Sequence, residues 1–274
     1  MIEIPESIVF ALHAENILRG KVVADVINAT YPHRFTWYQG DPSLYSSILA
    51  GRKVESIKGY GSYIDICFDN DTHLVFCDGT NIRYYEKTDK YPKKFQLLVA
   101  FEDNTFIVFT VAMYGGIYAF HGTFDNPYYC GSKEKLSPLD KKFDNHYFHK
   151  MITDSGKNLS VKALLATEQR IPGLGNGVLQ DILFNAGLNP KRRINTLSEK
   201  EERTLLSSIK DTLEDMVSQG GRDTEKDLLG NPGRYHCILS KNTCHEPCPK
   251  CGGKIIKEAY LGGSVYYCRD CQAL

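Results

Sequence analysis

No stretch of the sequence approaches the ~20 consecutive apolar residues that a membrane-spanning helix needs. The opening residues, MIEIPESIVF, have an acidic residue at position 3 and no basic segment ahead of the apolar ones, so we expect no secretion signal. Both absences argue against a membrane partner. We therefore expect a cytoplasmic protein.

The chain also lacks a net charge, because 33 Lys and Arg residues balance 33 Asp and Glu residues. Composition alone therefore gives no support for a nucleic-acid partner, and such support must come from local clusters such as Lys191-Arg192-Arg193. Internal repeats and low-complexity tracts are missing as well. With 274 residues and a hydrophobic content of 42%, the chain can form two domains with cores of their own.

The first half lacks the alternation of strands and helices that is typical of parallel sheets. A helix is expected over residues 5–19, with Pro5 in its first turn. The β-rich region that follows, about 22–120, has alternating apolar runs separated by short turns, which predicts hairpins in a sandwich. The clearest strands are expected at 63–69, 72–77, 95–101 and 104–111.

From about residue 157 the apolar period becomes helical, with helices expected within 161–169, 177–187 and 198–220. Ser198 and Glu201 form a capping box at the start of the last of these. We predict an α+β protein in four parts. These are an antiparallel β-sandwich with a flanking helix (1–125), a polar and aromatic linker (126–150), a helical domain (151–234) and a cysteine-bearing segment (235–274).

Nine cysteines is an odd number, and five of them follow no regular spacing, which favours reduced thiols over a disulfide framework. The other four form two CxxC pairs separated by sixteen residues. A β-hairpin between the pairs brings four thiolates around one ion, which predicts one structural zinc with no position left for a catalytic water. The ligands are Cys248, Cys251, Cys268 and Cys271.

A glycine-containing turn, Gly173-Leu174-Gly175-Asn176, separates two apolar helical segments. Glycines at a helix N-terminus allow a phosphate to approach backbone N–H groups without meeting a Cβ. Asn176 can cap the second helix or donate to the same phosphate. An ordinary turn between two helices is the alternative.

Together, PGLGN, LFNAGLNPKR and a four-cysteine hairpin ending in CRDCQ resemble the formamidopyrimidine-DNA glycosylase / endonuclease VIII family. The opening MIEIPE is similar to that family's MPELPE, and the glycine-rich segment 219–234 resembles the one that precedes its finger. The resemblance implies a β-sandwich joined to a helix-two-turn-helix domain and a zinc finger. It also implies that damaged double-stranded DNA binds in the cleft between these parts and that the damaged base is flipped out of the duplex. Because one chain forms this cleft, we expect a monomer.

In that family the N-terminal amine attacks the sugar and the next, acidic residue acts as acid and base. The resemblance therefore places Ile2, Glu3 and Glu6 in the catalytic region. A surface carboxylate at a helix N-terminus is the alternative for Glu3. The family's nucleophile is a proline freed by removal of the initiator methionine, whereas Ile2 is bulky and favours retention of Met1. The Met1 amine would then lie up to ~3.6 Å from the position that the reaction requires, an error that can cost about two orders of magnitude in rate.

Three other groups of the family are replaced. Ser62 stands in place of a lysine, Gly263 in place of the fingertip arginine, and Cys77-Asp78-Gly79-Thr80 in place of its HLGM segment. Asp181 stands where the family has a glutamate. Tyr114 and Met113 could enter the duplex beside the lesion, with a place in the sandwich core as the alternative. The remaining positions for which the resemblance implies DNA contact are Gly173, Gly175, Asn176, Lys162, Lys191 and Arg192.

Three functions are compatible with these features. The first is a glycosylase that relies on Glu3 and water, with weak or lost cleavage of abasic sites. The second is a non-catalytic protein that binds damaged DNA on the same scaffold, and the third is a zinc-ribbon interaction module without a DNA role.

Overall fold

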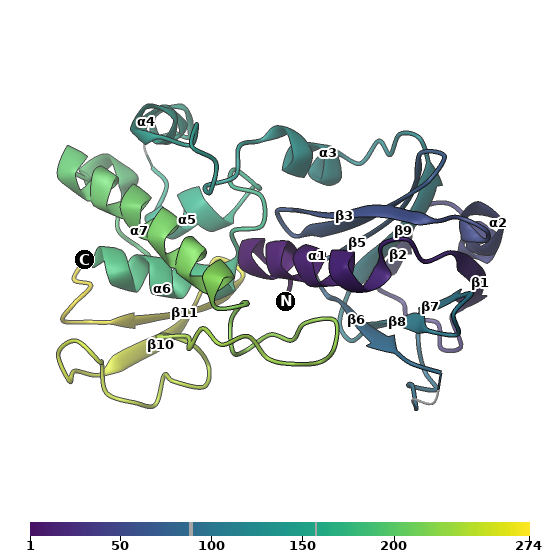
Figure 1. The fold of residues 1–274 in the computed structure, drawn as a ribbon. Helices are drawn as coiled ribbons and strands as arrows, with labels where there is room; N and C mark the ends of the chain where they lie inside the picture. The colour runs from purple at the N-terminus through teal and green to yellow at the C-terminus, as the bar shows by residue number, and fades with distance from the viewer. Residues whose placement is uncertain (88–89, 157) are drawn as a thin grey trace.

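The computed structural model describes residues 1–87, 90–156 and 158–274. A β-rich body and a helical body lie side by side, and helix α1 (Ile4–Leu18) lies between them, with the N-terminus near the centre of the molecule (Figure 1). Within the described ranges, no helix is long and apolar enough to cross a membrane.

The β-rich body consists of two sheets, with strand orders β2-β9-β5-β4-β3 and β1-β7-β8-β6. Neighbouring strands are antiparallel except for β2 and β9, which pair in parallel. The prediction of a β-sandwich is confirmed. The strands are β1 (Val23–Asn28), β2 (Thr36–Tyr38), β3 (Val54–Tyr60), β4 (Tyr63–Phe68), β5 (Thr72–Cys77), β6 (Thr80–Tyr85), β7 (Leu97–Phe101), β8 (Phe106–Val111) and β9 (Gly115–His121).

The sandwich core follows from the alternation of side chains along the strands. Ile64, Ile66 and Phe68 of β4 are buried between the sheets, while the residues between them face the other side of the five-stranded sheet. Helix α1 contributes Phe10 and Leu18 to the same core. The helix expected over 5–19 is therefore present, with each end one residue earlier, and it forms part of the sandwich core.

The helical body holds the second large core. Its elements are α4 (Asn145–Asp154), α5 (Val161–Ala166), α6 (Asn176–Ala186), η2 (Ile194–Thr196) and α7 (Glu199–Ser218), while η1 (Pro42–Leu44) and α2 (Tyr45–Leu49) belong to the sandwich. The capping box of Ser198 and Glu201 is present at the start of α7. Ile4, from the first turn of α1, is buried in this helical core. The chain's first residues therefore join the two bodies.

The stretch 126–150, expected to be a loop-like linker, instead contains α3 (Pro127–Glu134) and the first part of α4. Both helices begin at a polar cap, because Asn126 accepts hydrogen bonds from the N–H groups of Tyr128 and Tyr129, and Asp144 accepts one from Tyr147. The polar, aromatic composition hid these helices, since each buries only two side chains along its length.

The C-terminal hairpin pairs β10 (Ile255–Tyr260) with β11 (Gly263–Cys268) and packs against α6. Its Tyr266 N–H donates to the side-chain oxygen of Gln180 on α6, 3.0 Å away. The hairpin turn therefore lies next to the N-terminal end of α6, where the glycine-containing turn ends.

Candidate active site

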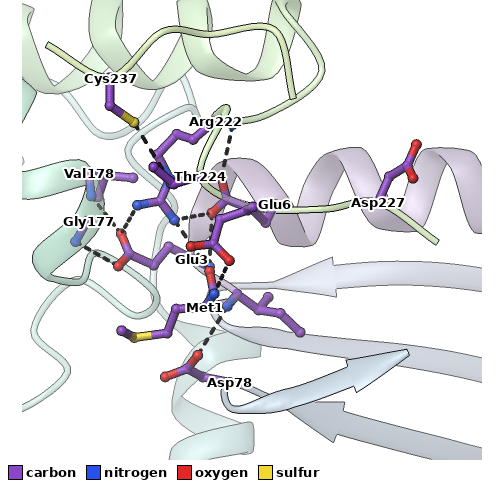
Figure 2. A network of polar contacts seen from close by, with 12 residues as sticks. Met1, Glu3, Glu6, Asp78, Gly177, Val178, Arg222, Thr224, Asp227 and Cys237 are labelled. Carbon is purple, nitrogen blue, oxygen red and sulfur yellow. Dashed lines mark hydrogen bonds and ion pairs between the residues drawn. The ribbon is translucent and has the colours of Figure 1, made fainter. Parts of the chain in front are cut away.

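Glu3 is buried, with 2% of its surface exposed, at the junction of the two bodies. Its two carboxylate oxygens accept hydrogen bonds from the N–H groups of Gly177 and Val178, both at 2.8 Å, in the first turn of α6. Figure 2 shows Glu3 pointing toward this helix end from the start of α1. A negative charge is favourable there, because the first N–H groups of a helix have no partner within the helix. The alternative of a surface carboxylate is wrong.

Arg222 is a buried cation that faces both glutamates of the first turn. Its Nη2 and Nε lie 2.6 and 2.9 Å from the two oxygens of Glu6, a bidentate pair, and its Nη1 lies 3.6 Å from Glu3 (Figure 2). Its side chain is 2% exposed. One cation thus holds two carboxylates in a region from which water is excluded.

The surroundings move the pKa values of these two carboxyl groups in opposite directions. Burial raises the pKa of Glu3 above its ordinary value, against the opposing effects of Arg222 and the two backbone N–H groups. Burial acts on Glu6 in the same direction, but the charge and hydrogen bonds of Arg222 outweigh it, so the pKa of Glu6 lies below its ordinary value. Of the two, Glu3 is therefore the more readily protonated.

The two N-terminal nitrogens are held by carboxylates from other segments. The terminal ammonium group of Met1 forms an ion pair with Glu225. The Ile2 N–H donates to Oδ1 of Asp78 at 3.1 Å, and Oδ2 of Asp78 accepts from the Tyr114 hydroxyl at 3.0 Å. Met1, Ile2, Tyr114 and Glu225 border a cavity of about 290 Å³, whose lining also includes Met113 and Arg222.

The glycines of the predicted phosphate-binding turn are required by contacts inside the protein. A Cβ at Gly175 would lie 2.6 Å from the carboxylate of Glu3, and one at Gly177 would collide with the guanidinium of Arg222 and lie 2.9 Å from the same carboxylate. Gly173 has a φ of +78°, and a side chain there would meet the backbone of Gly61 in the turn between β3 and β4. The expectation that this helix end presents bare N–H groups is thus wrong for Gly177 and Val178, since Glu3 occupies both.

Met113 and Tyr114 lie in the loop between β8 and β9, with 70% and 37% of their surfaces exposed. The alternative of a place in the sandwich core is therefore excluded for both. They border the cavity on the sandwich side, opposite the loop that carries Arg222.

The finger turn covers the other predicted contact residues. Lys162 is buried and donates from Nζ to the Tyr260 carbonyl at 2.5 Å. A Cβ at Gly263 would lie 2.5 Å from Nδ2 of Asn176, so the residue in place of the fingertip arginine packs directly on the glycine-containing turn. Lys191 pairs with Glu258 of β10 at 2.7 Å.

Arg192, the other predicted cation of this cluster, contacts the α7 region. Its Nε donates to the Thr196 hydroxyl at 2.7 Å and its Nη2 lies 3.6 Å from Glu201. The basic cluster of residues 191–193 is therefore neutralised in part by carboxylates of this chain.

The four cysteines expected to bind metal lie together, with all four sulfur atoms within 4.8 Å of one another. Cys248 and Cys271 are 3.8 Å apart, and Cys251 and Cys268 are 3.4 Å apart. Four sulfur donors at these separations fit a closed tetrahedral zinc site. The cluster therefore indicates a zinc finger.

The sequence did not single out Arg222, Asp78 or Glu225 as site residues. The Gly220-Gly221 pair before Arg222 was the available signal, because a residue after such a loop can turn back into the protein. Asp181, noted only as a replacement, accepts hydrogen bonds from the N–H groups of Ile238 and Leu239 at 2.9 and 2.8 Å. It joins α6 to the segment that leads into the finger.

Comparisons with known proteins agree with this architecture. The family model described as the formamidopyrimidine-DNA glycosylase H2TH domain matches residues 135–227. A formamidopyrimidine-DNA glycosylase of Brevibacillus brevis is 29% identical over 263 residues, covering 93% of this chain and 94% of that protein. One from Bacillus subtilis is 25% identical and covers 99% of both chains.

Two solved structures have the same fold. A complex of Lactococcus lactis Fpg with DNA containing an abasic site has a TM-score of 0.86 at 22% identity, covering 99% of this chain and all of that one. The MutM (Fpg) protein of Thermus thermophilus has a TM-score of 0.83 at 21% identity, covering 98% of both chains. The chain belongs to the formamidopyrimidine-DNA glycosylase / endonuclease VIII family.

The region that the family model matches forms one side of the junction between the two bodies. The matched H2TH region contains α5, α6 and α7, and it ends at Asp227, just beyond the loop that carries Arg222. The start of α1 and this region contact each other through Glu3. The start of α1 and the matched region therefore meet at a single buried carboxylate.

Proposed function

We propose that this chain is a DNA-repair glycosylase that binds damaged duplex DNA and releases the damaged base by cleavage of its N-glycosidic bond. The observation that carries the proposal is the buried carboxylate of Glu3 at the junction of the two bodies, where its neighbours Ile2, Glu6 and Arg222 line the cavity. We assign the sandwich domain to residues 1–125, the helix-two-turn-helix domain to 151–234 and the zinc finger to 235–274. The DNA would lie across all three, on a monomer.

The DNA-binding surface would be formed by the glycine-containing turn and the adjoining finger. Asn176 and the finger turn at Gly263 are in contact, and Lys162 lies beneath this turn. Lys191 and Arg192 lie on the same body, where each is paired with a carboxylate that a phosphate would have to replace. Met113 and Tyr114 are exposed at the opposite side of the cavity, where they could fill the space of an extruded base. Cys248, Cys251, Cys268 and Cys271 would hold one structural zinc that keeps the finger folded.

In the proposed reaction Glu3 supplies or accepts the proton, because burial raises its pKa while Arg222 keeps the pKa of Glu6 low. Glu6 and Arg222 would position the carboxyl group of Glu3. With Met1 in place, Ile2 nitrogen is an amide and the terminal ammonium group is paired with Glu225. Neither nitrogen is then a good nucleophile, so water is the expected attacking group and cleavage of abasic sites is expected to be weak.

Replacement of Glu3 by glutamine tests the proposal directly. We expect base release from lesion-containing duplexes to fall by about 10²–10⁴-fold, the usual contribution of a positioned acid or base. The measurement is single-turnover excision across a panel of oxidised, ring-opened and alkylated bases. Glu15→Gln is the matched control, because Glu15 lies on the same helix near its other end, where its carboxylate accepts the Ile57 N–H.

The competing function is a non-catalytic protein that binds damaged DNA on the same scaffold. It is favoured by one observation, that both oxygens of Glu3 are occupied by backbone N–H groups, as in a structural anchor. Tight binding of lesion duplexes without any released base, in the wild-type protein, would establish this function and refute the glycosylase. Thermal denaturation of Glu3→Gln separates loss of chemistry from loss of folding.

The position of the N-terminal nitrogen gives a second prediction. An Ile2→Pro variant presents a small residue that permits removal of Met1, and its amine would then lie where Ile2 nitrogen contacts Asp78. We expect borohydride to trap about 100-fold more covalent complex with abasic-site DNA than in the wild type, since a misplaced nucleophile loses about that factor. Intact-mass measurement confirms the processing, and Ile2→Leu, which retains Met1, is the control. Equal trapping in all three proteins would contradict the prediction.

A further inference from the structure

Three side chains of different chemistry lie together on the outer face of the β4–β5 hairpin. Ile64 and Ile66 of β4 face the sandwich core. Asp65 and Cys67, which alternate with them along the strand, therefore face outward. His73 of β5 is the cross-strand partner of Cys67. Side chains paired in this way have Cβ atoms about 4.5–5.5 Å apart. The hairpin therefore places a carboxylate, a thiol and an imidazole on one patch.

The three potential ligand atoms converge. The carboxylate oxygen, the sulfur and the ring nitrogen all lie within 4.8 Å of one another. Nδ1 of His73 is 2.9 Å from Oδ1 of Asp65. Asp65 is buried, whereas Cys67 and His73 are half-buried, so the group has a closed base and an accessible side.

A surrounding set of contacts fixes the orientation of two of these ligands. The Tyr129 hydroxyl of α3 donates to the other oxygen of Asp65 at 2.6 Å. Asp71 lies 3.4 Å from Nε2, the other ring nitrogen of His73. Phe120 of β9 stacks on the imidazole with ring centroids 5.1 Å apart. A carboxylate behind a ligating histidine and a hydrogen bond behind a ligating carboxylate are features of built metal sites.

We propose that Asp65, Cys67 and His73 bind a divalent transition-metal ion, with zinc as the preferred ion, at a site separate from the four-cysteine finger. The ligands would be Oδ1 of Asp65, Sγ of Cys67 and Nδ1 of His73. A mixed oxygen, sulfur and nitrogen set suits zinc and excludes magnesium and calcium, which prefer oxygen ligands alone. Three protein ligands leave a fourth position on the accessible side for water or another small ligand.

The metal-free alternative is an ion pair between a protonated His73 and Asp65. In that pair Nδ1 of His73 and Oδ1 of Asp65 face each other at 2.9 Å. A bound metal would take the same two atoms, so the ion pair and the metal site exclude each other.

The test uses the full-length protein with its finger already loaded with zinc, titrated with Co²⁺. We expect one further equivalent to bind, with a charge-transfer absorption from a single thiolate and without release of the finger zinc. Cys67→Ser should abolish that absorption, and His73→Gln provides a second variant should the first fail to fold. Tyr129→Phe, which touches no metal, should weaken binding by about 10–100-fold.

Cys130→Ser is the matched control, because Cys130 is next to Tyr129 on α3 but lies outside the ligand group. Its titration should match the wild type. Absence of a second equivalent, displacement of finger zinc as the only reaction, or an absorption that survives both Cys67→Ser and His73→Gln would overturn the proposal. None of these outcomes depends on DNA binding or base release.

Discussion

Replacing Arg222 with methionine is expected to lower the free energy of unfolding by about 3–5 kcal/mol at neutral pH, as for other buried ion pairs that lose one partner. The guanidinium group lies 2.6 Å from Glu6 and 3.6 Å from Glu3, and all three side chains are shielded from water. Without it, two negative charges remain buried side by side. Urea denaturation measures the effect. A destabilisation below about 1 kcal/mol would contradict this account of the junction.

The effect of Arg222→Met should depend on pH in a defined direction. In the variant, burial and the mutual repulsion of Glu3 and Glu6 outweigh the backbone N–H groups that donate to them, so we expect their pKa values in the folded state to lie above the unfolded values. Such groups stabilise the protein below the unfolded pKa, and that stability is lost as the pH rises through the folded pKa. The variant should therefore regain stability on acidification toward about pH 4.5, so that its difference from the wild type shrinks.

Two control variants identify the cause. Arg203→Met removes an exposed arginine from α7, whose partner Glu199 lies one turn away, and should change stability by less than about 0.5 kcal/mol. Combining Arg222→Met with Glu3→Gln and Glu6→Gln removes both stranded charges and should recover much of the loss.

Removing zinc, by chelation or by Cys268→Ser, should unfold the C-terminal hairpin and abolish specific DNA binding. Zinc contributes about 10–16 kcal/mol to the folding of small fingers, which exceeds what a two-stranded hairpin supplies by itself. Loss of the hairpin would leave Lys162 without the Tyr260 carbonyl and Asn176 without its contact at Gly263. We expect affinity for a lesion duplex to fall at least about 100-fold, toward non-specific binding.

Metal analysis and limited proteolysis of residues 248–271 measure the two parts of this prediction. Zinc content should fall by one equivalent, and the hairpin should become sensitive to protease. Cys244→Ser is the control, since Cys244 lies in the same C-terminal segment but outside the four-cysteine cluster. An apoprotein that binds lesion DNA as tightly as the zinc-loaded form would contradict the structural role of the finger.

The junction also explains why the glycine-containing turn has this sequence. Interpreted from the sequence, its glycines leave room for a phosphate; in the structure, Gly175 and Gly177 leave room for Glu3, and Gly173 for the turn at Gly61. The two explanations are compatible, because at this helix end Glu3 accepts hydrogen bonds only from the N–H groups of Gly177 and Val178. A phosphate could still approach other atoms of the turn. The turn thus fixes the proposed catalytic carboxylate relative to the DNA-binding surface.

Local patterns were sufficient for most of the fold. Alternation of apolar residues located β4, β5, β7 and β8, and the capping box of Ser198 and Glu201 located the start of α7. These signals are reliable because they arise from neighbours in the chain, through the pleat of a strand or the unpaired N–H groups of a helix. They failed at α3, where eight residues bury only Tyr129 and Ser132 and leave too little apolar pattern to detect.

By itself, the sequence determined the β-sandwich, the helical module, the spacing of the four cysteines and the family resemblance, because each depends on residues close together in the chain. Only the tertiary structure decided that Glu3 is buried, that Arg222 neutralises it together with Glu6, and that Asp78 and Glu225 hold the first two nitrogens. Those contacts join segments up to 224 residues apart. A charge so distant in the chain leaves no local pattern, since its partner is set by the packing of two domains against α1.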